Sequence, residues 1–255
     1  MSWDWIAKLQ ELKGQKAALV TLISCDGSTP RETGAKMIVL PDGTFYGTIG
    51  GGLLEQKLIG EAVVCIARGE SQHLNIELCP RTGQCCGGRV EVFVDVLKEP
   101  PKLYLFGAGH VGQALSRTLE GTPFEVHVVD PRKDWIEAEA LSKSAIRHRK
   151  SWDEFVAGAE WNEKSTYVAV MTHSHDMDQD IIGNVTKRPA KYVGLIGSES
   201  KWRRFQHRLA EAGTTRDELG RVRCPIGLPI GGKAPQEVAI SVASELLQVL
   251  HEGAT

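Results

Sequence analysis

The sequence predicts an α/β protein in which a smaller α+β domain precedes a C-terminal, doubly wound parallel sheet. Three observations support this prediction. Residues 102–130 read as a strand, a glycine-rich turn, a helix and a second strand, in that order. Further buried apolar runs alternate with helical patterns up to the C-terminus, which is typical of a parallel sheet. Before residue 99, turn signals separate short strands, which indicates an antiparallel sheet.

The segment 102–130 has the pattern of a nucleotide-binding βαβ unit. After an apolar run come Gly107, Gly109 and Gly112 in the spacing G-x-G-x-x-G, and Asp130 ends the second strand. In such units the first glycine permits a tight turn, the second lets a ligand approach the backbone, and the third lets the helix pack closely. The acid binds a ribose hydroxyl. We therefore predict a Rossmann-like domain that holds a phosphate or nucleotide at these four residues.

A domain boundary is predicted at Glu99-Pro100-Pro101, because a Pro-Pro step cannot join a central strand ladder. This gives a domain of residues 1–98 with a thiol-containing loop and a Rossmann-like domain of residues 102–255. A chain of 255 residues is long enough to bury two cores.

The composition excludes several classes of protein. The chain has 30 basic and 32 acidic residues and no block of lysine and arginine, which argues against nucleic-acid binding. The amino-terminal segment carries charges where a signal peptide needs an apolar core, and no apolar run has the length of a membrane span. We therefore expect a cytoplasmic protein without membrane contact, whose six cysteines form no disulfide framework.

Two segments of the first domain suggest ligand chemistry. Gly50, Gly51 and Gly52 precede a helix predicted over residues 53–68, and free N–H groups at a helix start favour an anion. A plain strand-to-helix turn explains the same glycines, so both interpretations stay open.

The second segment is the loop that contains Cys79, Cys85 and Cys86, whose neighbours are mainly Gly, Gln and Arg. Thiolate is the soft ligand and the strong nucleophile of proteins, so this thiol loop is a candidate to hold a soft metal centre or to carry sulfur. Its spacing does not match the paired C-x-x-C of closed zinc sites. Burial of the cysteines in the core is the alternative.

In the second domain, the predicted strand 166–171 ends in a polar cluster of His173, His175, Asp176 and Asp178. We expect it to face the same crevice as the glycine turn, because carboxyl ends of parallel strands share one edge. A metal site is one interpretation. The other is that acids in the first turn of a helix favour its dipole, and no HEXXH motif accompanies the histidines.

Other local signals concern helices. Lys201, Arg203 and Arg204 lie in the first turns of a predicted helix, where an anionic ligand or a solvated face would explain them. Capping boxes are predicted at Ser151 and Thr215. The last helix is expected to cover the sheet with its apolar side and to expose its polar side: Glu237, Ser241 and Glu245.

Five stretches in fixed order resemble the XdhC/CoxI family: residues 27–55, 83–93, 103–115, 192–205 and 224–247. The resemblance implies an accessory protein, not an enzyme, that binds the molybdenum cofactor (molybdopterin). Such a protein supports sulfuration of the cofactor with a cysteine desulfurase and inserts it into apo xanthine dehydrogenase. We also expect a homodimer.

By this resemblance, the thiol loop would approach the molybdenum or its sulfur through Cys85 or Cys86. The glycines 50–52 would border the cofactor, and the fingerprint glycines would hold a phosphate or a nucleotide part. Two other classes remain. One is an NAD(P)-dependent oxidoreductase using the fingerprint with His173 or His175 as acid/base, although no Tyr-x-x-x-Lys accompanies it. The other is a metallohydrolase built on these histidines and Asp178.

Overall fold

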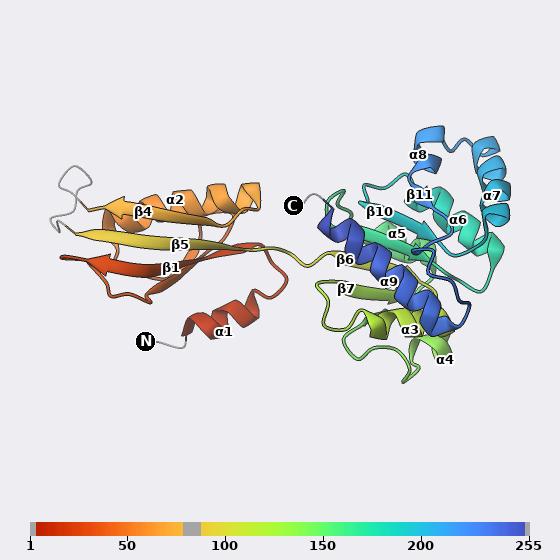
Figure 1. Ribbon diagram of the computed structural model, residues 1–255, viewed down its shortest axis with the longest axis horizontal. Helices are drawn as coiled ribbons and strands as arrows, with labels where there is room; N and C mark the ends of the chain where they lie inside the picture. Colours follow the sequence, from red (N-terminus) through yellow and green to blue (C-terminus); the bar gives the residue numbers. More distant parts are fainter. Residues whose placement is uncertain (1–3, 79–87, 253–255) are drawn as a thin grey trace. The chain divides into compact units, whose positions relative to one another are not determined.

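The computed structural model describes residues 4–78 and 88–252, which form two compact units, Met1–Glu99 and Pro100–Thr255 (Figure 1). The thiol loop cysteines lie outside the described residues, so the roles expected of Cys85 and Cys86 stay predictions.

The first unit is built on an antiparallel sheet in the order β3-β2-β1-β5-β4. Its elements are α1 (Asp4–Glu11), β1 (Ala17–Asp26), β2 (Lys36–Val39), β3 (Phe45–Gly47), α2 (Gly52–Arg68), β4 (Gln72–Glu77) and β5 (Arg89–Leu97). Successive side chains of a strand point to opposite faces. Val20 and Leu22 of β1 therefore pack with α2, whereas Ala17 and Leu19 pack with α1.

The second unit is a six-stranded, all-parallel sheet in the order β11-β10-β9-β6-β7-β8, which confirms the predicted doubly wound fold. Its strands are β6 (Lys102–Phe106), β7 (Glu125–Val129), β8 (Ile146–His148), β9 (Thr166–Val170), β10 (Tyr192–Leu195) and β11 (Val222–Arg223). The strand order reverses between β6 and β9. Open α/β sheets bind ligands at such a switch point, outside the carboxyl ends of the strands.

Helices cover both faces of this sheet (Figure 1). They are α3 (His110–Thr118), α4 (Lys133–Ile136), α5 (Trp152–Gly158), α6 (His175–Val185), α7 (Glu199–Glu211), α8 (Arg216–Gly220) and α9 (Pro235–His251). The helices α3 and α9 pack together on one face, and α5, α6 and α7 contribute to the core on the other. All five residues of β9 are buried, as expected for a central parallel strand.

Some local predictions were wrong. Ser151 precedes α5 but its side chain makes no capping hydrogen bond, whereas Thr215 forms the predicted capping box of α8. Ser241 and Glu245 of α9 are buried instead of exposed. The Glu245 carboxylate accepts hydrogen bonds from the hydroxyl of Tyr192 and the N–H of Gly227, both at 2.6 Å, so this helix binds the sheet partly through polar groups.

Within the described residues, no helix combines the length and the apolar character needed to cross a membrane.

Candidate functional site

The glycine fingerprint forms a tight loop between β6 and α3, and two of its glycines are required by packing. A Cβ on Gly107 would lie 2.4 Å from the carbonyl oxygen of Met171, and a Cβ on Gly112 would lie 2.1 Å from the carbonyl oxygen of Gly107. Such distances are far inside van der Waals contact. These two glycines therefore let the loop pass close to the end of β9 and let α3 pack on the loop.

Gly109 differs from its two neighbours in the motif. It is the N-cap of α3, its φ of −66° suits any residue, and apart from its two chain neighbours no described residue has an atom within 4 Å of an added Cβ. No side chain caps α3 at this end. Neither backbone conformation nor packing within the described part of the chain explains a glycine here. Close approach of a ligand to the backbone would explain it.

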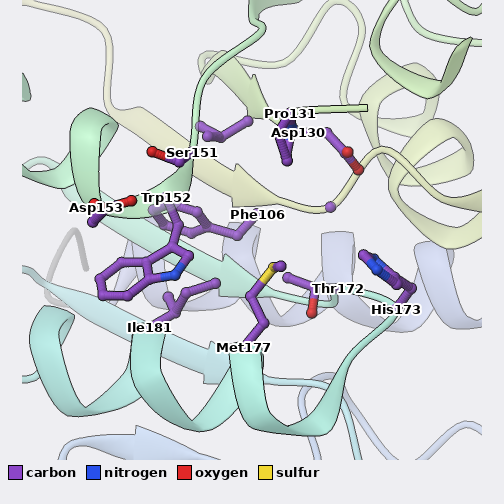
Figure 2. A pocket seen from close by; sticks show the side chains of 12 residues that line it. Phe106, Asp130, Pro131, Ser151, Trp152, Asp153, Thr172, His173, Met177 and Ile181 are labelled. Carbon is purple, nitrogen blue, oxygen red and sulfur yellow. The ribbon is translucent and has the colours of Figure 1, made fainter. Parts of the chain in front are cut away.

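A cavity of about 180 Å³ lies at the carboxyl ends of β6, β7 and β9 (Figure 2). Its lining comprises Phe106, Gly107, Val129, Asp130, Pro131, Ser151, Trp152, Asp153, Thr172, His173, Met177 and Ile181. Figure 2 shows Trp152, Met177 and Ile181 gathered on one side and His173 at the other end. Of the polar cluster that was expected to face the glycine turn, His173 lines this cavity together with Gly107, whereas His175, Asp176 and Asp178 are not among its lining residues. The cavity has apolar walls with a few polar groups, as small-molecule sites commonly do.

Asp130 lies at the end of β7 with only 3% of its surface exposed. Its Oδ2 accepts hydrogen bonds from the N–H of Ala108 at 2.9 Å and from Nη2 of Arg132 at 2.6 Å. Its Oδ1 accepts from the N–H and the Nε of Arg132 at 3.0 and 2.9 Å. Burial alone would raise the pKa of the Asp130 carboxyl, but these hydrogen bonds outweigh it, so the pKa lies below its usual range.

The guanidinium of Arg132 is held on its other side as well. It lies over the indole of Trp135, with 5.0 Å between the guanidinium carbon and the ring centroid. Trp135 in turn meets the ring of His110, the first residue of α3, edge to face at 5.2 Å. Side chains of the loops after β6 and β7 thus form one connected wall beside the glycine turn.

The polar cluster after β9 does not form a metal site. Asp178 is buried and forms an ion pair with Lys201, with 2.7 Å between Oδ2 and Nζ. Its Oδ1 accepts from the N–H and the hydroxyl of Thr172 at 3.0 and 2.7 Å. Throughout residues 4–78 and 88–252, no three His, Cys, Asp or Glu side chains gather as a metal site would require. The geometry of the described residues therefore does not support the interpretation of this cluster as a metal site, and it gives Asp178 a role in hydrogen bonding within the protein.

The basic start of α7 is also explained within the protein. Lys201 is buried, and besides its ion pair it donates to the carbonyl of Ile196 at 3.0 Å. Neither a solvated face nor an anionic ligand accounts for it. Arg203 and Arg204 are exposed, and Arg203 lies 4.0 Å from Glu199 on the same helix.

A carboxylate of the protein itself, that of Glu55, bonds to the glycine run 50–52. The carboxylate of Glu55 accepts hydrogen bonds from the hydroxyl of Thr48 at 2.6 Å and from the N–H groups of Ile49 and Gly51 at 3.1 and 3.2 Å. This carboxylate occupies the N-terminus of α2, where a ligand phosphate was one of the two interpretations. The strand-to-helix turn is therefore sufficient to explain the run, and its contact with a cofactor stays a prediction.

The base of the thiol loop lies beside the turn that follows β1. The N–H of Leu78 donates to the carbonyl of Gly88 at 2.8 Å, which closes the loop at its two ends. A Cβ on Gly88 would lie 2.5 Å from the carbonyl oxygen of Ser28, and a Cβ on Gly50 would lie 2.6 Å from the ring of Pro30. One turn thus packs against both the flank of the thiol loop and the glycine run.

The cysteines that the structure describes are free thiols: Cys25, Cys65 and Cys224. Burial raises the pKa of Cys65, and it raises the pKa of Cys224 to about 11. These two thiols are therefore protonated at neutral pH.

Both parts of the chain match known protein families. The family described as "XdhC and CoxI family" matches residues 11–77, and that described as "XdhC Rossmann domain" matches residues 103–246. The chain belongs to the XdhC and CoxI family. Its membership agrees with the resemblance expected from the motifs.

Three curated relatives extend this result. The chain is 31% identical over 248 residues to the uncharacterized protein YqeB of Escherichia coli strain K12, covering 95% of the chain and 45% of YqeB. It is 27% identical over 157 residues to a protein of Bacillus subtilis strain 168 that is named a probable xanthine dehydrogenase component, covering 62% of the chain and 45% of that protein. It therefore spans less than half the length of these two.

The third relative is the molybdenum cofactor insertion chaperone PaoD of Escherichia coli strain K12, which is 26% identical over 275 residues. The match covers 94% of the chain and 86% of PaoD. A crystal structure described as a xanthine dehydrogenase of Bacillus halodurans matches with a TM-score of 0.53 at 19% identity, covering 99% of this chain and 97% of that one. That structural likeness supports the fold alone.

Proposed function

We propose that this protein binds the molybdenum cofactor as cargo, supports its sulfuration together with a cysteine desulfurase, and inserts it into an apo molybdenum hydroxylase, specifically a xanthine dehydrogenase. One observation carries the proposal. A relative of nearly the same extent, PaoD, is named a molybdenum cofactor insertion chaperone. An accessory role in the XdhC and CoxI family, and not turnover of a substrate, is the function that this relationship favours.

The second unit has features that fit the cargo. A phosphate group suits the uncapped start of α3 beside Gly109, where N–H groups and the helix dipole attract an anion. A flat pterin suits the apolar walls that Trp152 and Met177 provide in the neighbouring cavity. Soft thiolate chemistry for molybdenum or its sulfur would come from Cys85 or Cys86. The two cysteines remain candidates on sequence grounds.

The dinucleotide-dependent oxidoreductase is the alternative that the fold keeps open. The fingerprint and the strand order are those of dinucleotide-binding proteins. Against it, the acid that would bind the ribose, Asp130, already accepts four hydrogen bonds from the protein. We therefore expect no NAD-dependent turnover.

The test uses the full chain, produced in cells that make the molybdenum cofactor. Pterin and molybdenum per protomer are measured, followed by activation of apo xanthine dehydrogenase, for the wild type, Cys85→Ala, Cys86→Ala and the double mutant. Cys224→Ala is the matched control, because burial keeps this thiol protonated. We expect the thiol-loop variants to lose cofactor while they keep the wild-type melting temperature.

Two results would contradict the proposal in different ways. A double mutant that still binds and delivers cofactor at the wild-type level would show that the thiol loop is not the site. Bound NAD together with substrate turnover by the wild type would favour the oxidoreductase.

A further inference from the structure

The position of Asp130 is the one where Rossmann-like folds read the ribose of a nucleotide. An ionised carboxylate has about four lone-pair positions. All four are used here, one by the N–H of Ala108 and three by Arg132. A ribose diol would need two of them. It could bind only by displacing the two side-chain hydrogen bonds of Arg132.

This displacement is unfavourable. The Nε and Nη2 of Arg132 form a charge-assisted fork with the two carboxylate oxygens, and such bonds are shorter and stronger than those from a neutral hydroxyl. The fork is also held in place, because the guanidinium lies over Trp135, which meets His110. The acid is therefore shielded from a ligand by a positioned side chain.

Arg132 also brings a partly exposed cation next to Asp130, which lines the cavity. Its side chain is 29% exposed, and its side-chain hydrogen bonds to Asp130 use Nε and Nη2, which leaves the N–H groups of Nη1 outside the fork. A guanidinium with free N–H groups at this point of the fold suits a phosphate, as in sites that accept a ribose 2′-phosphate.

We propose that Arg132 is a specificity-determining residue, which makes the crevice reject nucleotides with a free 2′,3′-diol and admit ligands that bring a phosphate to this position. The inference deepens the proposed function and rests on it for the identity of the cargo. The molybdenum cofactor has no ribose diol and therefore does not need the acid, and its phosphate is the group proposed above for the start of α3. NAD belongs to the rejected class, so it does not compete with the cargo.

The experiment is calorimetric titration of the full-length protein with NAD, NADP and adenosine 2′,5′-bisphosphate. We expect the wild type to bind the two 2′-phosphorylated probes at least about tenfold more tightly than NAD, the scale of one charge-assisted hydrogen bond. Arg132→Ala should abolish or reverse this ratio. Lys133→Ala is the matched control, because this neighbouring cation is 61% exposed and pairs with Glu137 instead of Asp130.

Arg132→Ala leaves the buried Asp130 unpaired, so its fold is checked by circular dichroism. Arg132→Lys is the second variant: it keeps a cation but cannot form the fork, and it should retain NADP binding and gain NAD binding. Equal affinities for NAD and NADP in the wild type, binding of neither at millimolar concentration, or an unchanged ratio in Arg132→Lys would each overturn the inference. Cofactor content is measured separately, so failure of the cargo proposal is recognised by itself.

Discussion

The starts of α2 and α3 differ in the side chain that bonds to the glycine-rich turn before the helix. Each helix follows a glycine-rich turn, and each has a glycine as its N-cap, Gly51 in α2 and Gly109 in α3. Four residues after the N-cap, α2 has Glu55, whose carboxylate accepts from the N–H groups before the helix. The equivalent residue of α3 is Gln113, whose amide donates to the carbonyl of Ala108 at 3.0 Å.

The difference shows that glycine spacing alone does not predict an anion site. A helix start attracts an anion only if the chain itself does not already supply one. Neither helix has a capping side-chain hydrogen bond, and each turn already contains a carboxylate of the protein. At α2 the carboxylate of Glu55 accepts from the N–H of the N-cap Gly51, whereas at α3 the carboxylate of Asp130 accepts from the N–H of Ala108, the residue before the N-cap. We therefore propose that the ligand phosphate binds at the second glycine turn, where the N–H of the N-cap is not taken by the carboxylate.

The largest loss of stability is expected from breaking the ion pair between Lys201 in the first turn of α7 and Asp178 in the first turn of α6. Lys201→Met leaves the buried carboxylate of Asp178 unpaired, which should cost about 3–5 kcal/mol of unfolding free energy. Denaturant unfolding of the full chain measures this loss. Arg203→Met is the control, because this side chain is 74% exposed and should leave stability near the wild-type value. Equal effects of the two substitutions would contradict an internal role for Lys201.

The next largest loss of stability should distinguish Gly112 from Gly109 in the fingerprint. Gly112→Ala places a Cβ 2.1 Å from the carbonyl oxygen of Gly107, so we expect a loss of about 2–3 kcal/mol. Gly109→Ala meets no neighbouring atom and should keep the wild-type stability while it lowers cofactor retention. Thermal unfolding and pterin content are measured for both variants. If Gly109→Ala unfolds as early as Gly112→Ala, this glycine is also structural.

A smaller effect tests the internal anion of α2. Glu55→Ala removes the acceptor for two N–H groups and should cost about 1 kcal/mol, as loss of a helix cap does. The freed donors should also make the melting temperature rise with added inorganic phosphate more steeply than in the wild type. Gln56→Ala, an exposed neighbour, controls for loss of a polar side chain. An unchanged phosphate dependence would contradict the view that this carboxylate occupies an anion site.

Much of the fold was predictable from the sequence because it depends on local patterns. Uninterrupted apolar runs identified the central strands, and the bounds of β9 agree within one residue with the predicted strand over residues 166–171. The short elements α4, β8 and β11 were missed, because two to four residues carry too little periodicity.

The site was less predictable, because its polar groups are paired over distances that no local pattern shows. Lys201 and Asp178 are 23 residues apart and start different helices, so the sequence placed them in two unrelated motifs. Arg132 follows Asp130 by two residues, and this short spacing was a signal that the side chain can fold back on the acid. The buried Glu245 was misread because helical periodicity identifies a polar face but not a polar partner.

The smallest change in stability is expected when α3 receives the acidic residue that α2 has at the equivalent position. Gln113→Glu gives α3 the carboxylate that α2 has in Glu55, at the position from which Glu55 accepts the N–H of its own N-cap glycine. We expect the free energy of unfolding to change by less than about 1 kcal/mol, because the loss of the hydrogen bond to the Ala108 carbonyl is offset by an acid near a helix start.

Binding should change much more than stability in this variant, because the internal carboxylate competes with the ligand phosphate for the same donors. Pterin and molybdenum per protomer should fall, and inorganic phosphate should no longer raise the melting temperature of the second unit. Gln113→Met is the matched control: it removes the amide without adding a charge and should keep the phosphate dependence. Retention of cofactor by Gln113→Glu at the wild-type level would mean that the start of α3 does not hold the phosphate, and the distinction between the two glycine turns would then concern packing alone.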